Sequence, residues 1–206
     1  MQTLSVAADY MRAALLAASN EETRYNLCGV HVVAKGRKVW IEATDGHIGY
    51  MAYQEIDPVE GEAPPEIAVN IIIPTDAVKA ALKAAGRAPS VELVIDGALH
   101  RLGSTIFTPI DGTFPDLARV VPKATSGEVA AFNPHYLSKI ADMFGFAKKR
   151  AVSASGCYQL HMNGSGPALC LCEKRPNELA VIMPWLQPCP TTAATAPSWA
   201  HALGNN

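Results

Sequence analysis

The stretch VNIIIPTDAVKAAL (residues 69–82) decides the fold, because it joins a short apolar strand directly to an amphipathic helix. Its first five residues are mostly β-branched, and its later part places Val78, Ala81 and Leu82 on one side of a helix. Pro74 suits the start of that helix, because its φ is fixed and its missing N–H group would have no partner there. The stretch therefore predicts a strand that leads without a loop into a helix packed on a sheet.

The same order of strand and helix occurs twice more, at residues 4–16 and 129–140. In the last of these, Asn133 is a suitable N-cap residue. Alignment of Pro74 with Pro134 makes Lys79 equivalent to Lys139, and a similar alignment of the first segment gives Arg12 the same position. Three units that recur about every 60 to 67 residues are therefore expected.

The pattern after each helix indicates antiparallel strands. Apolar runs flank the turn residues 35–37, residues 91–95 lead into an Asp-Gly turn, and two further runs cover 158–162 and 168–172. We therefore predict an α+β fold of repeated strand-helix-strands units, with the helices on one face of antiparallel sheets.

Two changes in composition suggest where the units end. Residues 57–66 are rich in Pro, Glu and Gly, and the chain after Pro188 loses all periodicity. We expect a first domain at 1–122, made of units 1–57 and 66–122, then a half-domain of one unit at 126–186, and a flexible tail at 187–206.

The overall composition favours a globular protein without a strong charge. The chain has 206 residues, of which 49% are hydrophobic and 17% are charged, and its net charge is −2. DNA contact would therefore need locally clustered Lys and Arg residues.

The start of the chain lacks the features of a signal peptide and no later run is long enough to span a membrane, so a cytoplasmic protein is expected. The five cysteines lack C-x-x-C spacing and are expected to be reduced.

The predicted helices carry the basic residues. Lys79, Lys83 and Arg87 are spaced four residues apart and form a stripe if the helix extends that far. Lys139 in the third helix is followed by Lys148, Lys149 and Arg150. Such stripes could contact phosphates without reading the base sequence. The alternative is an ordinary solvated helix face.

Residues 44–47 (Thr-Asp-Gly-His) raise the question of catalysis, since they place the carboxylate of Asp45 near the imidazole of His47. No Ser or Cys lies in a nucleophile-elbow context, and no second His follows at the spacing of metal ligands. A turn in which His47 is hydrogen-bonded is the simpler interpretation. We expect neither an enzyme nor a bound metal or cofactor.

Four motifs resemble those of the bacterial replicative sliding clamp family, the DNA polymerase III beta subunits. Residues 24–30 with 43–47 (RYNLCGV, then ATDGH) resemble R-Y-x-L-N-G followed by A-T-D-G-H-R-L. Residues 110–122 (IDGTFPDLARVVP) resemble D-G-x-F-P-D-Y-x-R-V-x-P, residues 132–137 (FNPHYL) resemble F-N-x-x-Y-L, and residues 180–184 (AVIMP) resemble V-V-M-P-M. The motifs occur in the family's order and cover residues 1 to about 186.

The resemblance implies a DNA-clamp fold and an apolar pocket that receives short peptides from DNA polymerase, clamp loader and repair proteins. The positions that match the family's pocket are Leu27, Thr44, Gly46, His47, Pro115, Arg119, Val120, Val181, Ile182, Met183 and Pro184. The alternative is that Val120 and Val181 are core residues where strands meet. The resemblance also adds Arg24 as a minor candidate for DNA contact.

The chain departs from the family in sequence and in length. Ile48, Gly49 and Trp185 stand where the family has Arg, Leu and Met, so a different partner specificity is expected for this chain. The family's chains have six units and close as dimers of twelve, whereas three units are expected here, so a twelve-unit ring would need a homotetramer.

The resemblance implies a sliding clamp that encircles double-stranded DNA independently of sequence, located in the cytoplasm at the nucleoid. The alternative is a clamp-like decoy that binds clamp-binding peptides without forming a ring. A hydrolase that uses Asp45 and His47 is a third, less favoured hypothesis.

Overall fold

A computed structural model describes residues 1–56, 67–97, 99–145 and 157–185 of the chain. The expected flexible tail at 187–206 and the candidates Lys148, Lys149 and Arg150 lie outside the described residues.

The described elements are grouped here by the three expected units. The first unit contains β1 (Gln2–Ala7), α1 (Ala8–Ala17), the short 3-10 helix η1 (Glu22–Leu27), β2 (Gly29–Lys35), β3 (Lys38–Thr44) and β4 (Ile48–Glu55). The second contains β5 (Ala68–Pro74), α2 (Thr75–Ala85), β6 (Ser90–Asp96), β7 (Leu99–Leu102), β8 (Thr105–Phe107) and the 3-10 helix η2 (Leu117–Arg119). The third contains α3 (Pro134–Met143), β9 (Gln159–His161), β10 (Ala168–Leu171) and β11 (Glu178–Ile182). The predicted α+β class is confirmed.

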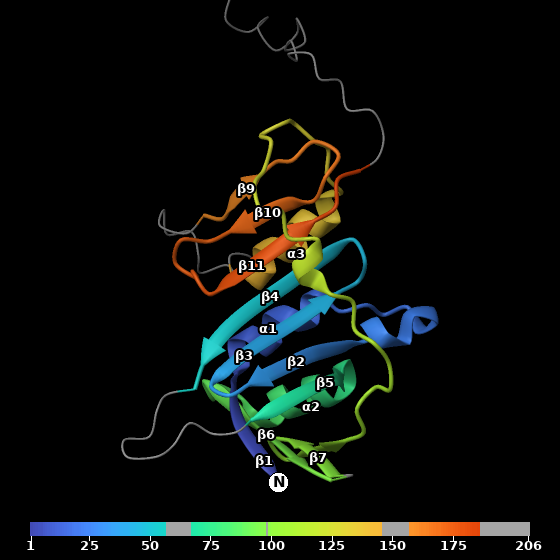
Figure 1. The fold of residues 1–206 in the computed structure, drawn as a ribbon, viewed down its shortest axis with the longest axis vertical. Coiled ribbons are helices and arrows are strands. Elements are labelled where there is room, and N and C mark those ends of the chain that lie inside the picture. Colours follow the sequence, from blue (N-terminus) through green and yellow to red (C-terminus); the bar gives the residue numbers. More distant parts are fainter. Residues whose placement is uncertain (57–66, 98, 146–156, 186–206) are drawn as a thin grey trace, which may run out of the picture.

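The strands form two antiparallel sheets in which the first two units exchange their first strands. One sheet has the order β1-β6-β7-β8, and the other has the order β5-β2-β3-β4-β11-β10-β9 (Figure 1). Thus β1 pairs with β6 of the second unit, and β5 pairs with β2 of the first. The longer sheet continues into the third unit because β4 pairs with β11, with Ile48 opposite Ile182 and Gly49 opposite Val181.

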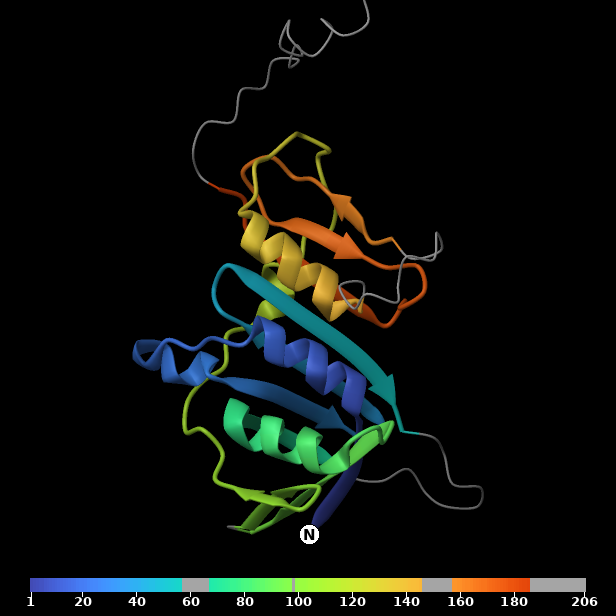
Figure 2. The same cartoon turned by 180° about the vertical axis from the view of Figure 1, so that it is seen from behind.

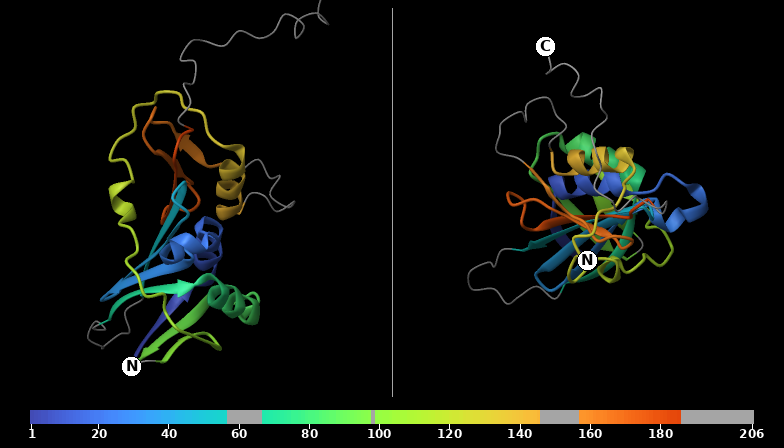
Figure 3. Two further views of the ribbon diagram at one scale, coloured as in Figure 1. Left: turned by 90° about the vertical axis from the view of Figure 1, so that its right-hand side faces the viewer. Right: turned by 90° about the horizontal axis from the view of Figure 1, so that it is seen from above.

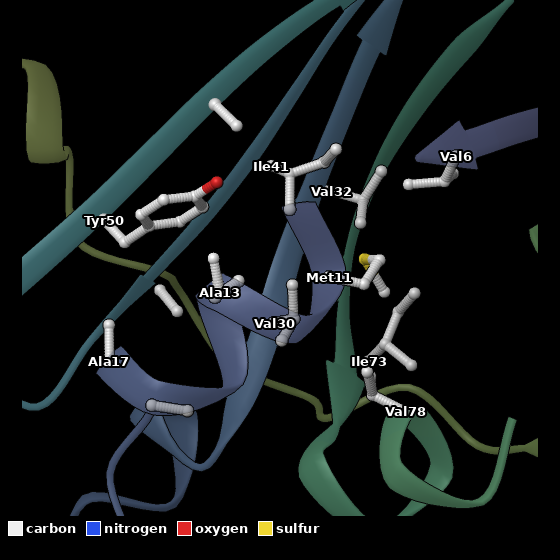
Figure 4. Close-up of a cluster of buried hydrophobic side chains, with 14 of the residues drawn as sticks. Val6, Met11, Ala13, Ala17, Val30, Val32, Ile41, Tyr50, Ile73 and Val78 are labelled. Atoms are coloured by element: carbon white, nitrogen blue, oxygen red, sulfur yellow. The ribbon is translucent and has the colours of Figure 1, made fainter. Parts of the chain in front are cut away.

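The three helices lie side by side on one side of the sheets, with α1 between α3 and α2 (Figures 2 and 3). Their apolar faces fill the main core. Met11 and Ala13 of α1 and Val78 of α2 point toward Val30, Val32 and Ile41 of the sheet, as Figure 4 shows, and all six are at most 3% exposed. Burial of this kind is the main force that holds helices on sheets.

The residues at which the helices begin correct one detail of the predicted repeat alignment. Pro74 is the N-cap of α2, whereas Pro134 is the first residue of α3 and Asn133 is its N-cap, with Asn133 Oδ1 accepting a bond from His135 N at 2.9 Å. Alignment on the caps makes Lys79 equivalent to Arg12 and to Ser138, so Lys139 is one residue further along its helix.

The expected strand at residues 129–132 is the second correction. The structure shows these residues without regular secondary structure, immediately before α3. The sequence has the right pattern there, but a strand also needs a partner edge.

Candidate functional site

Three segments far apart in the sequence meet where β4 joins β11. They are the loop between β3 and β4, the segment around η2, and the chain that leaves β11. Met183 N donates to His47 O at 2.8 Å, which ties the end of β11 to the loop. A Cβ atom on Gly49 would lie 2.9 Å from Val181 Cγ2 and 3.7 Å from Leu117 Cδ1, so β4, β11 and η2 approach closely here. The structure thus places most of the predicted pocket positions around one junction.

The loop that contains Asp45 and His47 is a hydrogen-bonded turn. Thr44 Oγ1 donates to Ile48 O at 2.6 Å and accepts from Gly46 N at 3.0 Å. Asp45 Oδ1 accepts from the backbone N–H groups of His47 and Ile48 at 2.9 and 3.0 Å. Gly46 has a φ of 91°, a conformation that favours glycine. These contacts fix the backbone of the turn, so the Asp45 carboxylate has a structural role.

The His47 ring faces the third unit. It stacks on Tyr136 of α3 with the ring centroids 5.4 Å apart and the planes at 21°. Lys139 Nζ lies 3.4 Å from Asp45 Oδ2 and 5.7 Å from the centroid of the Tyr136 ring. The side chains of Lys139 and Asp45 are only 23% and 13% exposed, so this ion pair is partly shielded from solvent. The pair and the ring stack together hold α3 against the loop.

The predicted pocket residues divide into a buried floor and an exposed rim. Val181, Ile182, Thr44 and Leu27 are buried, with Ile182 completely enclosed in the main core, and Pro184 is also buried. Val120 and Met183 keep 39% and 40% of their surface exposed. The other exposed positions of the predicted pocket are Gly46, His47, Pro115 and Arg119. We call Val120, Met183 and His47 the junction surface.

Leu117 and Tyr136 belong to this junction but were absent from the predicted set. Leu117 is buried in a small cluster with Leu27, Ile72 and Phe114, beneath the junction. Its position two residues after Pro115 in the Asp-Gly-Thr-Phe-Pro-Asp-Leu motif was the available signal. No signal in the sequence indicated that Tyr136 stacks on His47, because the contact joins residues 89 positions apart.

The basic residues of α2 lie on its solvent side. Lys79, Lys83 and Arg87 are exposed, whereas Val78, Ala81 and Leu82 are buried against the sheets. Lys79 Nζ is 3.4 Å from Asp76 Oδ1 at the surface, a pair that solvent weakens. Helix α2 ends at Ala85, with Gly86 as its C-cap, so the expected helical stripe includes Lys79 and Lys83, whereas Arg87 lies beyond the helix. We call these three exposed residues the α2 stripe, and they remain available to a polyanion.

The other candidates for DNA contact have different surroundings. Lys139 is occupied by Asp45, as described above. Arg24 pairs with Glu21 at 3.6 Å, and its Nη1 lies 2.8 Å from where a Cβ on Gly46 would be. Arg12, which is not among these candidates, donates to Asp9 Oδ1 at 2.8 Å and to Gly86 O at 2.7 Å, so it links α1 to the C-cap of α2.

Within the described parts of the chain, no group of three or more His, Cys, Asp or Glu residues could hold a metal ion. Cys28, Cys157, Cys170 and Cys172 are free thiols. Burial raises the pKa of Cys170 to about 12, which keeps its thiol protonated and unreactive at neutral pH. Among the helices that the structure describes, none is long and apolar enough to cross a membrane.

The arrangement defines a class of protein: a clamp-type fold in which paired strand-helix-strands units carry all their helices on one side of continuous sheets. Solved structures with this fold cover 91% of the chain at low sequence identity. They include the sliding clamp of Bacillus subtilis (TM-score 0.67, 15% identity, 65% of that chain) and the DNA polymerase III subunit beta of Pseudomonas aeruginosa (TM-score 0.68, 15% identity, 67% of that chain).

Sequence comparison points to the same family. The Beta sliding clamp of Caulobacter vibrioides is 31% identical over 148 residues, which is 68% of this chain and 36% of the relative. No family model matches the chain. The predicted resemblance is confirmed, and the chain is a relative of the bacterial beta sliding clamps that spans about a third of the length of the curated relatives it matches.

Proposed function

We propose that the chain is a DNA sliding clamp, a non-enzymatic processivity factor that encircles duplex DNA as a homo-oligomeric ring. The junction surface would recruit DNA polymerase and the clamp loader through short apolar peptides. The α2 stripe would face the DNA phosphates, and the protein would act in the cytoplasm, at the nucleoid. Three units in a chain and twelve in a family ring favour a homotetramer.

The observation that carries the proposal is the junction of β4 with β11. Met183 bonds through its backbone to His47 there, Val120 and Met183 are exposed, and His47 stacks on Tyr136, and these features support the proposal. Exposed apolar side chains beside a few polar groups suit a short linear peptide, and an exposed Met adapts to peptides of different shape. The same junction keeps the helices of the joined units on one side, as a ring with a helix-lined interior requires.

Peptide recruitment is tested by titrating a fluorescent clamp-binding peptide, taken from a replicative polymerase, against the full chain and against the double variant Val120→Ala, Met183→Ala. We expect the double variant to bind at least tenfold more weakly, since apolar anchors supply most of the binding energy at such sites. The matched control is Leu99→Ala, Ile106→Ala, which removes two exposed apolar side chains from β7 and β8. Equal binding by the two double variants would overturn the assignment of the junction surface.

Encirclement is tested on linear duplex DNA, onto which a closed ring can thread without a loader. With both ends blocked by biotin and streptavidin, a ring stays on the DNA at high salt, and it is released when one end is opened. Electrostatic binding alone would instead be lost at high salt in both cases. A chain that binds the peptide but is never retained between blocked ends would favour the clamp-like decoy.

A further inference from the structure

The first two units follow a rule of strand exchange. The first strand of each unit completes the sheet of the other: β1 lies on β6, and β5 lies on β2. Helices α1 and α2 then pack side by side. Neither sheet is completed by the first strand of its own unit.

Among the described residues, no unit makes this exchange with the third unit. Its sheet ends at β9, which pairs with β10 on one side and with no described strand on the other. The segment 129–132, in the position of a first strand, forms no strand. Only residues 120–133 separate the end of η2 from α3, so the chain between them cannot contain another unit.

Burial shows what the third unit is missing. Alignment on the helix N-caps makes Phe132 equivalent to Val6 and Ile73, which are 0% exposed, yet Phe132 is only partly buried. The same alignment makes Leu137 equivalent to Met11 and Val78, also 0% exposed, and Leu137 too is only partly buried.

The segment before α3 and the strand β9 carry further apolar side chains that are exposed or only partly buried. Val129 is 62% exposed, and Leu160 on β9 is partly buried. Phe132, Leu137 and Leu160 pack against the main core but are only partly buried in it.

We infer that two copies of the chain complete this unit for each other. Residues 129–132 of one copy pair with the outer edge of β9 in the second copy, and the exchange is reciprocal about a twofold axis. The two α3 helices then lie side by side, as α1 and α2 do. The inference does not depend on DNA or peptide binding, although it would supply one of the contacts that the proposed ring needs.

The hydrogen bonds do not oppose this exchange strongly. In the single chain the segment is held by Gly127 N to Met162 O at 3.0 Å, Gly164 N to Glu128 O at 3.0 Å and Trp185 N to Ala131 O at 2.8 Å. An intermolecular ladder along β9 replaces bonds of this kind with others of similar strength. The apolar surface of Phe132, Leu137 and Leu160 then decides the balance, because it leaves water only in the pair.

A second copy fits this edge better than an unrelated strand. The first two units share the order of strand, helix and strands, and they exchange their first strands reciprocally. By analogy, the outer edge of β9 suits a segment like the one that precedes α3. An identical third unit supplies that segment and also accepts the one that this chain offers. Open strand edges pair readily with other chains unless they are covered.

The test is a pair of proline substitutions in the full chain, Ala130→Pro and Ala131→Pro. Ladder bonds alternate along a strand, so one of these two N–H groups must point to β9 in either register, and proline removes both. Trp185 N can still bond to Ala131 O, so the fold of the single chain should survive. The matched control places the two prolines at Lys123 and Ala124 of the same segment.

Mass is measured by analytical ultracentrifugation over a hundredfold range of concentration. We expect the natural chain and the control to form species of at least twice 21.9 kDa, and the Ala130→Pro, Ala131→Pro variant to have half the mass of the natural assembly. A natural chain that stays monomeric, or a variant that keeps the natural mass, would overturn the inference.

Hydrogen exchange of residues 159–161 provides the second readout. We expect their amides to become protected as the natural chain assembles, and to stay unprotected in the variant while the β4–β11 amides remain protected in both. Protection of β9 in a monomer would mean that the segment pairs within its own chain and would contradict the exchange. Peptide titration on the same samples separates the two proposals, because the junction surface does not include the substituted residues.

Discussion

Tyr50 and Glu178 form a buried polar contact where β4 meets β11. Tyr50 is 0% exposed, and its hydroxyl donates to Glu178 Oε2 at 2.7 Å. Arg175 Nη1 donates to both oxygens of the same carboxylate, at 3.0 and 3.1 Å. A buried carboxylate needs such partners, since an unpaired charge inside a protein is strongly unfavourable. The contact therefore fixes which strands join at this edge of the first unit.

Replacement of Tyr50 by Phe should lower the free energy of unfolding by about 1.5–3 kcal/mol at pH 7, the usual contribution of a hydrogen bond to a charged group. Urea unfolding measures the difference. The control is Tyr53→Phe on the same strand, whose hydroxyl donates to Glu55 at the surface and whose loss should matter much less. Equal losses of unfolding free energy in the two variants would mean that the buried hydrogen bond stabilises the protein no more than the exposed one.

The same residue predicts how stability changes at alkaline pH. Burial, together with the nearby Glu178 carboxylate, raises the pKa of Tyr50 far above its ordinary value of 10.0. Above pH 10 the unfolded chain therefore loses a proton that the folded chain keeps, so the free energy of unfolding decreases as the pH rises. One such group contributes a slope of roughly 1.4 kcal/mol per pH unit.

Urea unfolding between pH 9 and 11.5 tests this dependence. The natural chain should lose its stability advantage over Tyr50→Phe as the pH rises above about 10. The other tyrosines are present in both proteins and cancel in the comparison. A constant difference across this range would show that Tyr50 ionises in the folded chain as it does in the unfolded one.

At the scale of elements, local patterns predicted most of the strands and helices, but not their partners. The strand and helix at 69–82 were predictable because alternating and helical periodicities are properties of short segments. The predicted strand at 129–132 is not formed, because its pattern is that of a strand but no strand edge in the described part of the chain pairs with it. The pocket positions came from motifs of the family, and their division into a buried floor and an exposed rim needed the β4–β11 pairing. The ion pair of Lys139 with Asp45 could not be predicted from the sequence either, because it depends on the same long-range pairing of β4 with β11.

Helix α2 allows a test of which face of the protein meets DNA. Replacement of Lys79 and Lys83 by Ala should weaken binding to duplex DNA and make the slope of log affinity against log salt less steep by up to about 2, since each phosphate contact contributes about 0.9. Lys35→Ala with Lys38→Ala, at the β2–β3 turn, removes the same charge from exposed positions away from the helices and is the control. Fluorescence anisotropy at several salt concentrations measures both. A larger effect of the control pair would place the DNA on another face.

At the scale of the whole molecule, strand exchange between third units would make a pair of chains with three complete domains. Each end of the pair is then a β8 edge, since β8 ends the smaller sheet. Two pairs joined at these edges contain twelve units, the number in a family ring. The tetramer that the repeat count favours would then have two kinds of contact between chains, one at β9 and one at β8. Each of them would have twofold symmetry.

This arrangement predicts where partners bind. In a ring, the twofold axis between paired third units must keep the helices of both chains on the inner side. The axis therefore points from the centre of the ring outward, and rotation about it turns one flat face of the ring into the other. Junction surfaces of paired chains therefore point to opposite faces, two on each, whereas chains arranged head to tail would present all four on one face. Electron micrographs of the assembly with a peptide fused to a bulky tag should show the tag on both faces, with one peptide bound per chain by calorimetry. Tags on a single face would exclude the twofold exchange and leave a head-to-tail ring, because no radial twofold axis can relate sites that all lie on one side.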